Sequence, residues 1–136
     1  MPISQEEAFA RIRLLRSPNV GPVSFRQMLA RFGNAVAALE ALPEMAARGG
    51  GKQQPAPEAL VRDEVAAVRA ANARYLFHDD PAFPALLAEM HNAPPILTIR
   101  GDLALLQKPA VAIVGARNAS AAAISLARQF GRELAQ

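Results

Sequence analysis

The chain has 136 residues, of which 51% are hydrophobic and 20% are charged, so its composition is that of a folded protein and not of a disordered tail. It has no cysteine, which excludes disulfides, thiolate catalysis and cysteine-ligated zinc, and which fits the reducing cytoplasm. With only two histidines we expect no metal site, and we expect no cofactor. No stretch approaches the about 18 apolar residues of a membrane span, and the N-terminus does not read as a signal peptide.

The net charge of +3 is unevenly distributed along the chain. Residues 1–50 hold six arginines and four glutamates, and residues 91–136 hold five basic and two acidic residues. Residues 51–90 instead hold four basic and six acidic residues. The two ends therefore suit a polyanionic partner, while the middle has the charge balance of an ordinary surface.

Residues 1–48 predict a small all-helical domain. A capping-box pattern at Ser4 and Glu7 starts the first helix, and Gly33 is a typical residue to end the second. Pro43 is expected to close the third helix and to separate it from a short fourth one. The predicted helices cover residues 4–17, 22–33, 34–42 and 44–48. Residues 49–57, which are rich in Gly, Pro and Gln, predict a linker.

Residues 58–136 predict a mixed α/β unit. The expected elements are a helix over 58–72, a short strand over 75–77, a helix over 84–90, an extended segment over 95–100 and a helical turn over 103–106. His78, beside Asp79 and Asp80, fits a solvated turn residue better than a metal ligand.

The segment Ala110–Val114 is an uninterrupted apolar run, typical of a strand buried on both faces of a parallel sheet. It is followed by Gly115, a polar turn and a helix with apolar residues at spacings of three and four. This is the pattern of the first strand and helix of a doubly wound α/β fold. Because no further strand follows, we expect the α/β unit to be incomplete.

The turn between that strand and helix predicts an anion site, formed by Gly115, Arg117, Asn118 and Ser120. Gly115 permits a phosphate to approach the backbone closely, and the Arg117 guanidinium can donate two hydrogen bonds to it. The helix N-terminus adds N–H donors and partial positive charge. The alternative is that Ser120 only caps the helix and that Arg117 is only solvated. The turn has neither the G-x-G-x-x-G dinucleotide motif nor a Gly-Lys-Ser/Thr phosphate loop, so a nicotinamide or ATP enzyme has little support.

A second candidate DNA contact lies at Val20 and Gly21, within Pro18-Asn19-Val20-Gly21-Pro22. This sequence resembles a helix-hairpin-helix turn, in which backbone N–H groups at a helix N-terminus meet a phosphate without reading sequence. The alternative is a tight connection between two core helices.

The ordered set of motifs resembles the DprA/Smf family of bacterial DNA-processing proteins over about residues 11–136. The stretch Leu14–Gly33 is similar to the N-terminal helical, SAM-like domain of that family. The later matching residues are Tyr75, Asp80-Pro81, Phe83-Pro84, Leu86-Leu87, Pro94-Pro95, Leu97, Arg100-Gly101-Asp102-Leu103, Ala110–Val114, Gly115, Arg117 and Ser120.

The resemblance implies a cytoplasmic, non-catalytic, homodimeric protein that binds single-stranded DNA in natural transformation and helps to load the RecA recombinase. It also implies a Rossmann-like pocket, beginning at Gly115, Arg117 and Ser120. The chain departs from the family at Ala116, where a hydroxyl residue is common, and it lacks the later Ser-Gly-x-Ala-x-Gly-Ile-Asp motif. We therefore do not carry over the surfaces for dimerisation and RecA contact. The alternatives are a fragment of a nucleotide- or phosphate-binding Rossmann-like enzyme and a structural interaction module.

Overall fold

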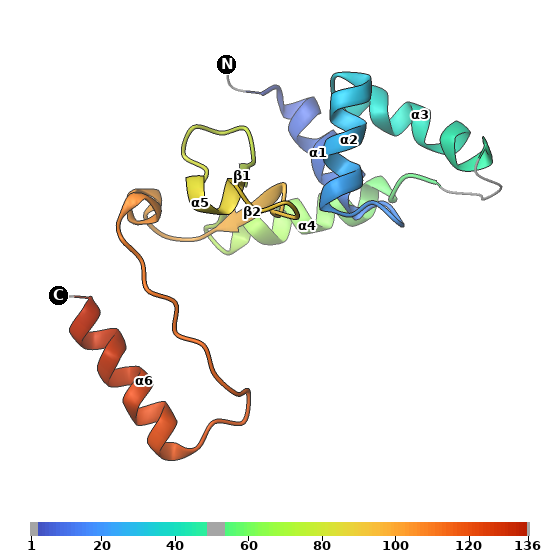
Figure 1. Cartoon of the computed structure of the whole chain (residues 1–136). Coiled ribbons are helices and arrows are strands. Elements are labelled where there is room, and N and C mark those ends of the chain that lie inside the picture. The colour runs from blue at the N-terminus through green and yellow to red at the C-terminus, as the bar shows by residue number, and fades with distance from the viewer. Residues whose placement is uncertain (1–2, 49–53, 136) are drawn as a thin grey trace.

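The computed structural model describes residues 3–48 and 54–135. In Figure 1, three helices pack together near the N-terminus, a fourth runs beside them, a small sheet follows, and the last helix stands apart after an extended segment. The elements are α1 (Gln5–Arg16), α2 (Pro22–Phe32), α3 (Ala35–Arg48), α4 (Glu58–Ala70), β1 (Arg74–Phe77), α5 (Ala85–Ala88), β2 (Ile96–Ile99), a 3-10 helix η1 (Leu103–Gln107) and α6 (Ala121–Leu134).

The main core lies between α1, α2 and α3, each of which places apolar residues at helical spacing on its inner face. Leu14 and Phe25 are fully buried there, and small alanines on α1 and α3 allow the helices to approach closely. The buried cluster consists of Ala10, Leu14, Phe25, Met28, Ala35, Ala38, Leu39 and Leu42.

The helix ends follow the local sequence closely. The Ser4 hydroxyl accepts from the Glu7 N–H at 3.1 Å, and Gly33 ends α2 with a left-handed φ of 84°. Asn34 accepts from the N–H of Ala37, in the first turn of α3. The Glu7 carboxylate does not return to Ser4, because both of its oxygens accept from the Ala35 N–H at 3.0 Å. One side chain of α1 therefore caps α3.

Pro43 does not end the third helix as predicted, since α3 continues through it to Arg48. A proline inside a helix forfeits one backbone hydrogen bond and strains the preceding turn. Here the flanking residues Leu42, which is buried, and Met45, which packs against the core, hold the helix in place on both sides. Tertiary packing outweighs the local preference, and the predicted break between two helices is wrong.

The sheet consists of β1 and β2, which pair antiparallel with Arg74 opposite Ile99 and Phe77 opposite Ile96. Leu76 is the buried residue of β1, and the other side chains of the pair are at least partly exposed. The His78 N–H donates to the Pro95 carbonyl at 2.9 Å, which extends the pairing past the strand ends.

Arg11 of α1 connects the helical region to the residues that follow β1. Its Nε donates to Glu7 at 2.8 Å, and its Nη1 donates to both carboxylate oxygens of Asp79, at 2.7 and 2.9 Å. The guanidinium also lies 5.6 Å from the centre of the Phe77 ring. Because Arg11 is only 8% exposed, its charge depends on these two carboxylates.

Two further arginines of α1 reach across to the region that follows residue 53. The Arg13 Nε donates to the Ala56 carbonyl at 2.7 Å, and Arg16 forms a two-bond pair with Glu64 of α4 at 2.7 and 2.8 Å. Glu64 also accepts from the Tyr75 hydroxyl at 3.0 Å. The Arg16 hydrogen bonds lower the pKa of Glu64, while burial and the bond to Glu64 raise the pKa of Tyr75 to about 12. Polar contacts thus join α1, α4 and β1.

The predicted linker over residues 49–57 lies partly outside the described residues, which resume at 54. Ala56 is buried, and its N–H donates to the Ser17 hydroxyl at 3.0 Å. Residues 54–57 therefore pack along the end of α1, and the division of the chain into two domains stays a prediction.

Ala110–Val114 does not form the predicted strand. The segment has no regular secondary structure and its side chains are exposed, with Ile113 at 53% and Val114 at 90%. A strand needs a neighbour to bond its N–H and C=O groups, and in the described part of the chain β1 and β2 pair only with each other. In Figure 1 this segment is the long extended connection that leads to α6.

Candidate nucleic-acid interface

The predicted anion site is a solvent-exposed turn directly before α6. Gly115, Arg117, Asn118 and Ser120 are all exposed, and Ser120 is the N-cap of α6. The Ser120 hydroxyl accepts from the Ala123 N–H at 3.2 Å, so its role as a helix cap is present in the structure. As acceptor in that bond, the hydroxyl keeps its own proton for a second partner.

The turn and the first half of α6 enclose a shallow hollow with a volume of about 600 Å³. Three of the four predicted residues line it, namely Gly115, Asn118 and Ser120, whereas Arg117 lies outside the lining. Arg128 lines the same hollow from α6. Arg128 was not predicted from the sequence, although it lies four residues, about one helical turn, after Ile124, which lines the same hollow.

The charge at this turn is positive and uncompensated. Within residues 54–135 the structure gives Arg117 and Arg128 no ion pair, and the first-turn N–H groups of α6 point out of its N-terminus. An exposed guanidinium beside a helix N-terminus is an arrangement that binds phosphate. The apolar side chains of Ile113 and Ile124 line the hollow as well and offer surface to a base or sugar.

The second predicted contact, at Val20 and Gly21, lies in the connection between α1 and α2. Asn19 adopts a left-handed φ of 58°, which an Asn side chain tolerates, and Gly21 is the N-cap of α2. The Gly21 N–H, however, donates to the Ser24 hydroxyl at 2.9 Å, and Val20 packs against the core. Both predicted residues therefore serve the local packing in this structure, and their contact with DNA stays a prediction.

A hollow of about 310 Å³ lies next to this hairpin, between α2 and α3. Gln27 and Arg31 of α2 provide its long polar side chains, and Met28 and Met45 provide apolar walls. Arg31 stacks over the Phe32 ring at 5.2 Å and is otherwise exposed. Gln27 and Arg31 were not predicted from the sequence, because they lie on the helix face opposite the apolar residues of α2.

His78 is not the solvated turn residue that was predicted. Its ring packs edge-on against the buried Phe25 at 6.1 Å, and its Nδ1 is buried without a hydrogen-bond partner in the described structure. Burial lowers the pKa of His78, whereas the hydrogen bond from Arg11 lowers the pKa of Asp79. The turn lies against α2, so its histidine faces the core, while its aspartates remain exposed.

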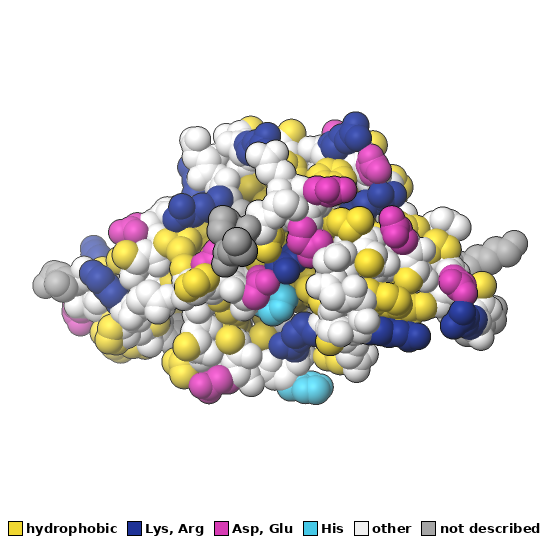
Figure 2. Space-filling model, turned by 90° about the horizontal axis from the view of Figure 1, so that it is seen from above, with side chains coloured by type: hydrophobic (Ala, Val, Ile, Leu, Met, Phe, Trp, Pro, Cys, Tyr) yellow, Lys and Arg dark blue, Asp and Glu magenta, His cyan; other side chains and the backbone are white. Residues whose placement is uncertain are grey.

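Basic and acidic side chains are interspersed over the face shown in Figure 2, with apolar side chains between them. The basic side chains on this face therefore do not form one continuous patch. The described residues include no group of three or more His, Cys, Asp or Glu placed to hold a metal ion. None of their helices has the length and apolar character needed to cross a membrane.

The sequence matches two family models that follow one another along the chain. The model described as the DprA-like N-terminal HHH domain covers residues 5–67, from α1 into α4. The model described as DNA recombination-mediator protein A covers residues 74–136, from β1 through α6. No curated protein matches the chain. The predicted α/β class, with a helix-hairpin-helix domain followed by part of a Rossmann-like region, is confirmed, and the chain belongs to the DprA/Smf family of DNA-processing proteins.

Proposed function

We propose that this protein binds single-stranded DNA through the turn that precedes α6. The observation that carries the proposal is the exposed, uncompensated positive charge of Arg117, in the turn before α6, and of Arg128, which lines the hollow from α6. Phosphates fit these donors, and Gly115 leaves the backbone open to close approach, because no residue beyond its chain neighbours lies within 4 Å of the position that a Cβ would take. Such contacts follow the backbone and carry no sequence preference.

The proposed role is non-catalytic and cytoplasmic. Donors that hold phosphates in place protect a strand and present it to a recombinase without chemical turnover. Membership in the family supports a role in DNA processing during transformation, and loading of the RecA recombinase belongs to this proposal. The surfaces for RecA contact and for dimerisation are not assigned to residues of this chain.

The test is a fluorescence-anisotropy titration of the full chain with a labelled single-stranded oligonucleotide at two salt concentrations. We expect affinity to fall as salt rises, with a slope of about −0.7 per phosphate contacted. Arg117→Ala should weaken binding by about tenfold, a typical effect for one charge-assisted contact, for every oligonucleotide sequence alike.

Arg132→Ala is the matched control, because Arg132 is also exposed but lies in the last turn of α6, away from the hollow. It removes the same charge and should change affinity far less than Arg117→Ala. Equal effects of the two variants would show that binding depends on net charge alone. Salt-independent binding, or none from a folded sample, would reject the proposed function.

A further inference from the structure

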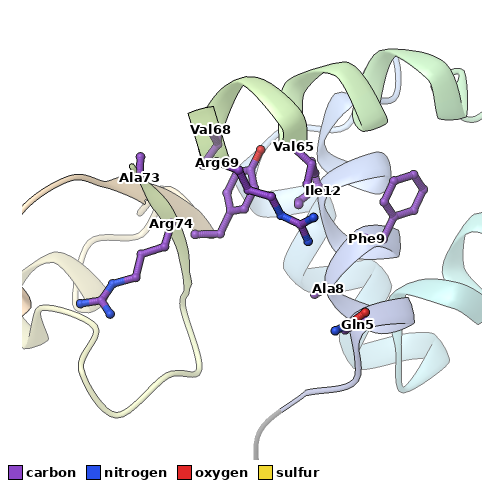
Figure 3. A pocket seen from close by; sticks show the side chains of 10 residues that line it. Gln5, Ala8, Phe9, Ile12, Val65, Val68, Arg69, Ala73 and Arg74 are labelled. Atoms are coloured by element: carbon purple, nitrogen blue, oxygen red, sulfur yellow. The ribbon is translucent and has the colours of Figure 1, made fainter. Parts of the chain in front are cut away.

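A second hollow, separate from the turn before α6, lies between α1, α4 and β1. It has a volume of about 340 Å³, and apolar side chains from α1 and α4 make most of its surface. Figure 3 shows these two helices on either side of it. The lining residues from α1 are Gln5, Ala8, Phe9 and Ile12, and those from α4 are Val65, Val68 and Arg69.

The rim of this hollow has positive charge without compensation. Arg69 and Arg74 both line it, and in the described part of the chain neither forms an ion pair or a side-chain hydrogen bond. In Figure 3, Arg69 extends from α4 towards the α1 side of the hollow, whereas Arg74 points away from it. None of the lining residues carries a carboxylate.

The contrast with the neighbouring arginines is informative. Arg13 and Arg16, on the same helix as Phe9, are bound to carboxylates of α4, and Arg62 on α4 is bound to Glu58. Arg69 lies two turns further along α4 and has no such partner, although acidic residues are frequent in this part of the sequence. The charge of Arg69 is therefore available to a negatively charged ligand.

The ligand must also bring a flat apolar group. Two of the seven aromatic residues, Phe9 and Tyr75, line the hollow, and both are only partly buried. Aromatic faces next to a guanidinium and an amide, here Arg69 and Gln5, are the groups that hold unstacked bases of single-stranded nucleic acids. An acidic peptide would satisfy the charge but would make no use of the two aromatic rings that line the hollow.

We infer that this hollow holds an unstacked base of single-stranded DNA, with Arg69 on the adjacent phosphate. The inference rests on the proposed function and adds a second contact to it, formed by α1, α4 and β1 and not by the turn before α6. The strand would then touch both halves of the chain, through the unpaired arginines of each.

The test uses the full chain with two variants, Phe9→Leu and Arg69→Gln, in the same anisotropy titration. Phe9→Leu keeps an apolar side chain but removes the ring, and it should weaken binding by about fivefold or more, the effect of losing one stacked base. It should leave unchanged the affinity for an oligonucleotide of abasic sites, which offers phosphates without bases.

Arg69→Gln should weaken binding to the ordinary and the abasic oligonucleotide alike. Arg62→Gln, on the same helix, is the control and should weaken binding to neither oligonucleotide. Circular dichroism and urea midpoints establish that each variant is folded.

The outcomes separate this inference from the proposed function. If the chain binds DNA and depends on Arg117 but not on Phe9 or Arg69, the inference is overturned and the proposed function stands. If the folded chain does not bind DNA, both fail. If a poly-glutamate peptide of equal charge competes as well as the oligonucleotide does, the hollow takes acidic protein segments, and the assignment to a base is wrong.

Discussion

Two parts of the chain differ in whether they contain buried apolar side chains. The described residues up to 99 contain a buried core, whereas residues 109–135 contain no buried residue. Leu14 and Phe25 of the helical region are fully buried, and Val61 and Leu76 of the next region are buried as well. In residues 109–135, by contrast, Val114 is 90% exposed and Phe130 of α6 is 49% exposed. The two parts have similar apolar patterns in sequence, yet only the first uses them to pack.

Within the exposed part, the helix forms and the strand does not. The hydrogen bonds of α6 lie within the helix itself, and Ser120 caps its start, so it needs no neighbour to have its backbone satisfied. The segment Ala110–Val114 needs another strand for the same purpose. The comparison teaches that an apolar run predicts a strand only where a partner strand is present.

The largest expected effect on stability comes from removing Arg11, the buried cation that joins α1 to Asp79 after β1. Arg11→Met keeps the length and apolar stem of the side chain but leaves Asp79 without its cation. We expect the free energy of unfolding to fall by about 2–3 kcal/mol. Breaking a fully buried ion pair usually costs more, but the Asp79 side chain is 45% exposed and water can solvate its charge. Urea unfolding followed by circular dichroism measures this.

Arg48→Met is the matched control, since the pair of Arg48 with Glu44 is exposed at both ends and should contribute less than about 1 kcal/mol. Equal losses from the two variants would show that Arg11 does not join the two regions in solution.

A smaller loss of folding stability is expected at low pH, and it should again arise from the packed part alone. The pKa of His78 is lowered by burial, so the folded state resists its protonation and stability should decline as pH falls through about 6.5. The pKa values of Asp79 and Glu64 are lowered by their arginines, so a second decline should follow below the ordinary carboxyl range of about 4.

Melting temperatures at several pH values between 7 and 3 measure both declines. His78→Gln should remove the first decline and keep the second, whereas His91→Gln, at an exposed position, should keep both. A first decline that persists in His78→Gln would assign it to another group.

The smallest effect is expected in the exposed part. Ile113→Ser replaces an apolar side chain that is 53% exposed and packs in no core cluster, so the unfolding free energy should change by less than about 0.5 kcal/mol. The same urea titration measures it. A loss comparable to that of Arg11→Met would show that residues 110–114 pack against the rest of the molecule in solution.

Several parts of the candidate site followed from sequence because they are local. Ser120 caps the helix that follows it, and Gly115, Asn118 and Ser120 line one hollow, as their close spacing suggested. Arg69 did not follow, because the hollow that it lines is formed by α1, α4 and β1 together, and Arg128 was missed although helical spacing places it one turn after Ile124. Whether any of these residues binds DNA stays a prediction.

The sequence by itself determined most of the helices, the caps at Ser4 and Asn34, the left-handed stop at Gly33 and the motifs that identify the family, since these depend on residues within a few positions of each other. Only the tertiary structure decided the rest. Packing carried α3 through Pro43 and turned His78 towards Phe25, and the absence of a neighbouring strand in the described residues left Ala110–Val114 unpaired. In each of these cases the deciding contact comes from another element of the fold, which local sequence patterns do not record.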